Sequence, residues 1–200
     1  MVDREDNILT FVAFIYNYLE SLNDARLNSF LANWPSSDLK TRSIIPCLLP
    51  VLSWMPCAVK AAGRRTGFLI DMLASLANDL AWGQTYSAQD FGAGFLKKYG
   101  WTEFIGLRGL IACDRMACGV LFLGPQIEYS RHSHAAEEVY VPLTEPTLWQ
   151  RGVQEWAYSA AGLPIYHSSG EWHAMRTESV PLLALYLWRG GDLAQKSIIE

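Results

Sequence analysis

A short segment, HSHAAEEVY at positions 132–140, places four metal-binding or acid–base side chains at even positions. These are His132, His134, Glu138 and Tyr140. Side chains on a β-strand alternate between its two faces, so all four would project from one face of a continuous strand. Val139 and Val141 would then point to the opposite face, as in a strand that packs on a core. The segment therefore predicts a strand that carries a functional site. The spacing favours Glu138 as the carboxylate on the face of the histidines, although a bulge would place Glu137 there instead.

All four histidines of the 200-residue chain lie between positions 132 and 173. Together with Glu138, the residues His132, His134 and His173 supply the imidazole and carboxylate groups that bind first-row metals. We therefore expect one divalent ion, which these ligands allow to be zinc, iron(II), manganese or nickel. His132 is either a ligand or a residue that contacts the substrate beside the ion. We expect His167, which precedes a turn-like stretch, to be a structural or rim residue rather than a ligand.

The composition favours a compact enzyme or binding protein over a nucleic-acid-binding or membrane protein. Half of the residues are apolar, and the formal net charge is −4, whereas phosphate binding requires a basic surface. The longest apolar stretch, residues 44–59, contains three prolines and is too short to span a bilayer. The acidic start lacks the features of a secretory signal. We therefore expect a cytoplasmic monomer or homodimer that binds a small molecule, no nucleic acid and no membrane.

The apolar pattern changes near residue 100. Before that point, apolar residues recur at intervals of three and four, which predicts amphipathic helices. Helices are expected over residues 7–22 (with Asp6 as N-cap), 25–34 and 66–82. After Gly100, short apolar runs separated by turn residues predict strands. Strands are expected over residues 104–110, 117–123, 137–143, 163–167 and 182–188. We predict a mainly β chain in which a helical extension, residues 1–100, packs on a β-barrel or sandwich, residues 101–200.

Two motifs resemble those of a known superfamily. The pattern H-S-H-x3-E at 132–138 and the pattern G-x5-S-S-G-x2-H at 162–173 resemble the two signature motifs of the cupins. The stretches 112–119, 136–143 and 173–188 are similar to the cupin-type dimethylsulfoniopropionate (DMSP) lyases of marine bacteria, some of which carry a helical extension. The resemblance implies a double-stranded β-helix barrel with the metal inside. It also implies the cleavage of DMSP into dimethyl sulfide and acrylate.

The resemblance also implies roles for three aromatic residues. Tyr140 matches a tyrosine assigned as the general base, and a phenolate is suited to this task if the metal lowers its pKa. Tyr129 matches a second tyrosine that orients the substrate or acts as the alternative base. Trp188 matches a pocket residue, whose aromatic face suits a sulfonium cation; on the sequence alone it is equally a barrel-core residue. A cupin dioxygenase and a non-enzymatic ligand-binding cupin are the alternatives with the same ligands.

Overall fold

The computed structural model describes residues 4–35 and 39–200 and contains helices in its first half and two β-sheets in its second. The helices are α1 (Arg4–Ser21), α2 (Ala25–Leu31), α3 (Met55–Lys60), α4 (Gly67–Leu76) and α5 (Ala88–Leu96), with short 3-10 helices η1 (Pro50–Trp54) and η2 (Ala77–Asp79). The strands are β1 (Trp82–Gly83), β2 (Tyr99–Gly106), β3 (Ile111–Ala112), β4 (Met116–Leu123), β5 (Glu128–Ser133), β6 (Glu137–Pro142), β7 (Thr147–Arg151), β8 (Ala157–Ser159), β9 (Ile165–His167), β10 (His173–Arg176), β11 (Leu182–Arg189) and β12 (Ile198–Ile199).

The first two helices form where the apolar spacing predicts them. Helix α1 buries one stripe of side chains at intervals of three and four, including Phe11 and Ile15. It begins at Arg4, so the prediction of Asp6 as its N-cap is wrong, and Asp6 lies in the first turn. Helix α2 is capped by Asp24, whose carboxylate accepts hydrogen bonds from two backbone N–H groups of the first turn.

The predicted helix over residues 66–82 is wrong in its second half. Helix α4 ends at Leu76, the chain tightens into η2, and the backbone is extended at Leu80. Trp82 instead belongs to β1, which pairs with β2, and its indole N–H donates to the carbonyl of Ala77 at 2.9 Å. The helical spacing of apolar residues continues through this turn, but pairing with a strand that lies later in the chain determines the structure.

The two sheets have the topology of an eight-stranded jelly roll, the architecture of the cupins. Within the described residues, one sheet has the order β1-β2-β4-β11-β6-β9, with β3 beside β2, and the other has the order β12-β5-β10-β7-β8. Consecutive strands from β4 to β7 alternate between the large and the small sheet, and the strands from β8 to β11 alternate in the same way. The predicted mainly β fold with a double-stranded β-helix barrel is confirmed.

Three of the predicted strands agree with the structure to within one residue, and they occupy the middle of the large sheet. These are β4, β6 and β11. The prediction over residues 104–110 is displaced, because β2 starts at Tyr99 and ends at Gly106, which adopts a positive φ of 143° before the turn toward β3. Strand β9 is shorter than predicted, and it starts at Ile165 rather than Leu163.

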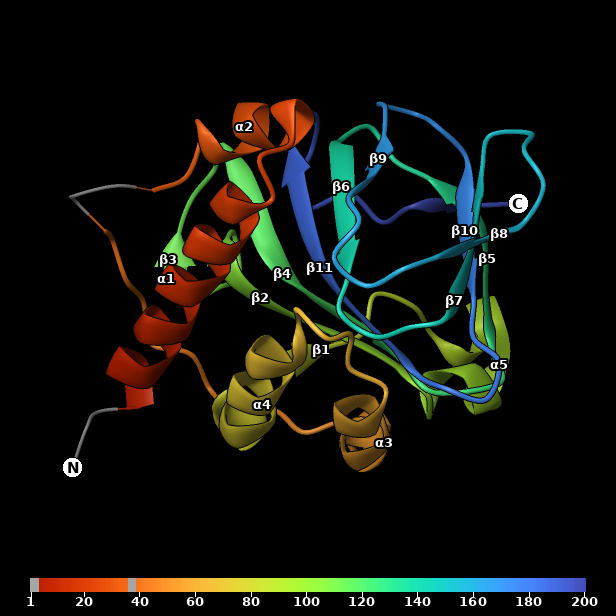
Figure 1. Cartoon of the computed structure of the whole chain (residues 1–200), viewed down its shortest axis with the longest axis horizontal. Helices are drawn as coiled ribbons and strands as arrows, with labels where there is room; N and C mark the ends of the chain where they lie inside the picture. The colour runs from red at the N-terminus through yellow and green to blue at the C-terminus, as the bar shows by residue number, and fades with distance from the viewer. Residues whose placement is uncertain (1–3, 36–38) are drawn as a thin grey trace.

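The large sheet has two unlike faces, and helices α1, α2 and α4 cover one of them (Figure 1). On that face Val139, Val141 and Leu185 pack in one apolar cluster with α1, α2 and α4. The opposite face points into the barrel, toward the smaller sheet formed by β5, β7, β8 and β10. The prediction that Val139 and Val141 face away from Glu138 and Tyr140 is confirmed, because the latter two line the internal cavity.

Among residues 4–35 and 39–200, no helix combines the length and the apolar character that crossing a membrane requires.

Candidate metal centre and internal cavity

The predicted continuous strand over residues 132–140 is wrong, because the chain turns in the middle of it. Strand β5 ends at Ser133 in the small sheet, and β6 starts at Glu137 in the large sheet. The ring Nδ1 of His134 lies 2.9 Å from the carbonyl oxygen of Ala136, which holds this turn closed. Alternation along one strand therefore does not bring His134 and Glu138 together; a tight turn between two sheets does.

Three of the predicted ligands converge at this turn. Suitable donor atoms of His134, Glu138 and His173 all lie within 4.8 Å of one another, and all three residues are buried. One carboxylate oxygen of Glu138, Oε2, lies 3.0 Å from Nε2 of His134 and 3.2 Å from Nε2 of His173. The Nε2 atom of His173 is buried without a hydrogen bond of good geometry to any described residue. This arrangement is that of a carboxylate and two imidazoles gathered around one point.

Backbone carbonyl groups fix the orientation of the imidazole rings. The Nδ1 atoms of His132, His134 and His173 lie 2.8, 2.9 and 2.8 Å from carbonyl oxygens two residues away. A carbonyl oxygen only accepts hydrogen bonds, so each neutral ring carries its proton on Nδ1 and its lone pair on Nε2. The rings therefore present the nitrogen that a metal ion requires, and the backbone supplies the hydrogen bonds that orient metal-binding histidines.

The charges of Glu138 and His134 are mutually dependent. Burial alone would raise the pKa of Glu138, but the charge and hydrogen bond of His134 and the nearby ring of His173 lower it well below its usual value. Burial alone would lower the pKa of His134. The charge and hydrogen bond of Glu138 outweigh burial, so the pKa of His134 is raised. The buried carboxylate is therefore ionised and requires positive charge beside it.

His132 and His167 lie on either side of His173, outside the group of three donors. The ring of His132 meets that of His173 edge-on, with 4.2 Å between centroids, and stacks on Tyr129 at 3.8 Å. Burial and the charge of His173 lower the pKa of His132 well below its usual value. Whether His132 binds the ion or the substrate stays a prediction.

His167 stacks on the other side of His173, with 4.1 Å between ring centroids. It is fully buried, so the expectation of a rim position is wrong, and its two nitrogens have no hydrogen-bond partner among the described residues. The pairing of β9 with β6 places it directly opposite Glu138. Sequence spacing does not reveal this position, because the register between two distant strands sets it.

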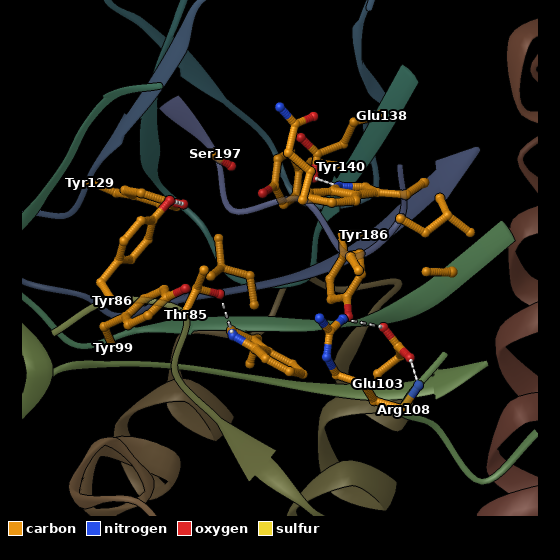
Figure 2. Close-up of a pocket in the computed structure, with 17 residues that line it drawn as sticks. Thr85, Tyr86, Tyr99, Glu103, Arg108, Tyr129, Glu138, Tyr140, Tyr186 and Ser197 are labelled. Atoms are coloured by element: carbon orange, nitrogen blue, oxygen red, sulfur yellow. Dashed lines mark hydrogen bonds and ion pairs between the residues drawn. The ribbon is translucent and has the colours of Figure 1, made fainter. Parts of the chain in front are cut away.

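A cavity that is open to solvent lies between the two sheets and reaches Glu138; together with the space at its mouth it measures about 630 Å³. Figure 2 shows Glu138 and Tyr140 in the upper part of the view and Tyr86, Tyr99 and Tyr129 at the left. Three more side chains that line the cavity, those of Glu103, Arg108 and Tyr186, gather at the lower right. Acidic, basic and aromatic groups thus meet in a space that is large enough for a small zwitterion.

The two tyrosines singled out by the sequence both line this cavity, but their contacts differ. Tyr140 is buried, and burial together with the charge and hydrogen bond of Glu138 raises its pKa well above the usual value. The hydroxyl of Tyr129 lies 2.5 Å from that of Tyr86. Tyr140 therefore adjoins the metal-site carboxylate, whereas Tyr129 belongs to a separate group of tyrosines.

Trp188 connects the cavity wall to the metal centre. Its indole N–H donates to Oε1 of Glu138 at 2.5 Å, and its ring lies 4.1 Å from that of His134. The indole is partly exposed to the cavity that it lines. Trp188 thus orients the carboxylate and lines the cavity, and its role in binding a ligand stays a prediction.

Several cavity residues are absent from the sequence-based prediction. Tyr99, Trp101 and Glu103 alternate along β2 and all line the cavity. Their spacing of two indicates that they share one face of a strand. The sequence reading missed this because it placed the strand over residues 104–110. Tyr86 precedes the capping box formed by Ser87 and the side chain of Asp90 at the start of α5, a helix that the sequence reading did not predict.

Comparisons with known proteins agree on one family. The chain is 33% identical over 109 residues to the DMSP lyase DddQ of Ruegeria pomeroyi, covering 54% of each protein. It is 30% identical over 157 residues to the putative DMSP lyase DddL of Cereibacter sphaeroides, covering 72% of this chain and 65% of that protein. The aligned segments thus span between about half and two thirds of these relatives.

Solved structures extend the comparison to the whole chain. A crystal structure described as one of the DMSP lyases RdDddP and RnDddQII superposes with a TM-score of 0.89 at 25% identity, covering 99% of this chain and 100% of that one. The DddQ structure from Ruegeria pomeroyi has the same fold, with a TM-score of 0.85 at 24% identity over 100% of this chain and 97% of that one. Residues 25–184 match the dimethylsulfoniopropionate lyase family, and the chain therefore belongs to that family.

Proposed function

We propose that this chain cleaves DMSP to dimethyl sulfide and acrylate by a metal-dependent β-elimination. The observation that carries the proposal is the buried group of His134, Glu138 and His173 beside Tyr140 in one cavity. Membership of the DMSP lyase family supports the choice of substrate. The protein would act on this small molecule in the cytoplasm, as a monomer or homodimer, without nucleic acid or membrane.

The residues fit one divalent ion, with His134, Glu138 and His173 as its ligands and His132 as a further ligand or substrate contact. The buried Nε2 of His173, which lacks a well-formed hydrogen bond, is a donor atom without another use among the described residues. Imidazole and carboxylate together admit zinc, iron(II), manganese or nickel. When bound, the ion supplies positive charge that favours the phenolate of Tyr140 and neutralises the substrate carboxylate.

Tyr140 is the proposed general base. Its phenolate oxygen would accept the proton on the carbon next to the carboxylate, and the electron pair of that C–H bond would form the new carbon–carbon double bond. The carbon–sulfur bond then breaks, and its electrons leave with sulfur as neutral dimethyl sulfide. Tyr140 is favoured over Tyr129 because it contacts Glu138, whereas the hydroxyl of Tyr129 is bonded to Tyr86.

The proposed substrate contacts are Tyr129, His132 and Trp188. Tyr129 and His132 form one stack beside His173, and Trp188 stands on the other side of the metal centre against His134. A substrate carboxylate at the metal centre would thus lie between an imidazole and an indole. Both walls exclude water from the reacting atoms, which strengthens the electrostatic interactions there.

The test is headspace gas chromatography for dimethyl sulfide after DMSP is added to protein reconstituted with each of zinc, iron(II), manganese and nickel. A sample treated with a chelator serves as the control. Release that depends on a metal is expected. Absence of release with all four metals would contradict the lyase proposal; oxygen consumption or ligand binding without turnover would then point to a dioxygenase or a binding protein with the same ligands.

A further inference from the structure

Glu103 is a buried carboxylate on the cavity wall for which the proposed elimination has no use. Its side chain is 4% exposed, and it lies on β2, on the opposite side of β4 and β11 from the metal-site residue Glu138. Oε1 accepts hydrogen bonds from the backbone N–H groups of Arg108 and Gly109, at 2.5 and 3.0 Å. Oε2 lies 4.0 Å from the guanidinium of Arg108, and the charge of Arg42 acts on the carboxylate from further away. Oε1 thus stabilises the turn at Arg108 and Gly109, and Oε2 is available to a ligand in the cavity.

The floor between Glu138 and Glu103 is formed by the two intervening strands, β11 and β4. Along one row of the sheet, Glu138 pairs with Trp188, and Trp188 pairs with Ala117. A methyl group placed on Gly106 would lie 2.6 Å from Oε1 of Glu103 and 3.1 Å from the Cβ of Ala117, so the carboxylate reaches the edge of that floor. Two strand spacings, which amount to about 10 Å, separate Glu138 from Ala117. Glu103 lies on β2, one strand further along the sheet.

Aromatic rings stand around this floor. Trp101 is two residues before Glu103 on the same face of β2, and Trp188 flanks the floor on the side of the metal centre. Tyr186 lies across Gly119, where an added Cβ would meet its hydroxyl oxygen at 2.6 Å. Figure 2 shows the Tyr186 hydroxyl pointing toward Glu103 and Arg108. Three aromatic side chains and one carboxylate form the surroundings that attract a methylated cation, which has no hydrogen to donate.

We propose that Glu103, with Trp101, Tyr186 and Trp188, forms a subsite for the onium cation of the substrate, a sulfonium or quaternary ammonium group. This inference rests on the proposed function, because it takes the substrate carboxylate to lie at the metal centre. In an extended DMSP molecule about 4 Å separates the carboxyl carbon from sulfur, as standard bond lengths require. The sulfonium would then lie over Ala117, between Trp188 and the carboxylate of Glu103. Arg108 is the competing cation of this subsite.

The experiment compares two inert ligands of the same shape that differ by one positive charge. These are 3-(trimethylammonio)propionate and 4,4-dimethylpentanoate, both measured by titration calorimetry on the metal-reconstituted protein. The unchanged protein should bind the cationic ligand about tenfold more tightly. Glu103→Gln should reduce this preference to within about twofold, because its amide oxygen keeps the two backbone hydrogen bonds but loses the charge. Glu178→Gln, which removes an exposed carboxylate bonded to Tyr158, should keep the preference.

The charge preference separates this proposal from the lyase proposal, because it is a ratio of binding affinities and does not depend on the release of dimethyl sulfide. A chain that releases no dimethyl sulfide can still discriminate the two ligands, and an active lyase can fail to do so. An unchanged affinity ratio between the two ligands in Glu103→Gln would contradict the subsite. It would mean that Glu103 only stabilises the turn at Arg108 and Gly109. Arg108→Gln provides a second test if Glu103→Gln does not fold. Arg108 is about half exposed, so its substitution should not prevent folding. It should increase the preference for the cation, and a decrease or no change would contradict the proposal.

Discussion

The two faces of the large sheet use the same strands for different purposes. On the helix-covered face, Val139 and Leu185 are fully buried among apolar side chains, and their contribution to stability follows from the area removed from water. On the cavity face, the buried carboxylate of Glu138 accepts a hydrogen bond from Trp188 and adjoins the phenol of Tyr140. Neighbouring positions on one strand thus serve different purposes. Substitutions on the helix-covered face should lower the free energy of unfolding, whereas those on the cavity face should lower activity.

The largest effect is expected from His134→Ala. This substitution removes one of three converging donors and leaves Glu138 without its closest positive partner. Metal content should fall, and the rate of dimethyl sulfide release should fall about a thousandfold or more. Metal analysis and headspace chromatography measure the two quantities. Val139→Ala, on the other face of the neighbouring strand, is the matched control and should keep both, and His134→Ala with normal metal content would remove His134 from the ligand set.

Tyr140→Phe should abolish most of the elimination while metal content stays unchanged. The phenyl ring keeps the packing against Trp149, but it lacks the oxygen that accepts the proton. A loss of about a hundredfold to ten-thousandfold in kcat is expected for a missing general base. Tyr158→Phe, at an exposed tyrosine, controls for the substitution itself. Loss of the metal from Tyr140→Phe, or a larger loss of kcat in Tyr129→Phe, would count against Tyr140 as the base.

On the helix-covered face, Leu185→Ala should lower stability and spare the chemistry. Leu185 is fully buried, and truncation of such a leucine costs about 2–5 kcal/mol of unfolding free energy. Denaturant unfolding measures this cost, and kcat per folded molecule should stay within about threefold of the unchanged protein. A tenfold drop in kcat at constant metal content would show that the two faces of the sheet are coupled.

The smallest effect is expected on the pH dependence of stability in metal-free protein. Burial lowers the pKa of His167 to about 2, from about 6.5 in the unfolded chain. Below pH 6.5 the unfolded chain therefore binds a proton that the folded chain does not, so the free energy of unfolding falls as the pH decreases. His167→Phe should make this slope shallower by up to about 1.4 kcal/mol per pH unit. Equal slopes in denaturant unfolding between about pH 7.5 and about pH 5.5 would contradict a neutral buried His167.

The sequence predicts those parts of the fold in which local pattern and tertiary context agree. Strands β4, β6 and β11 combine unbroken apolar runs with alternation, and their faces follow from Val139 and Val141. His134, Glu138 and His173 converge although the assumed geometry was wrong, because the spacing of His134 and Glu138 suits a turn as well as a strand. The position of Glu103 was missed, since the start of β2 depends on pairing with β4, a strand that comes later in the chain.

The position of β11 also determines when the protein can mature. This strand lies between β4 and β6 and pairs with both, although more than fifty residues separate β4 from it along the chain. Such non-local pairing folds slowly, because long loops must close before the contacts form. During synthesis, β6 exposes Glu138 well before β10 delivers His173 and β11 delivers Trp188. The candidate metal site is therefore completed late in synthesis, and a growing polypeptide holds only part of it until these last strands emerge.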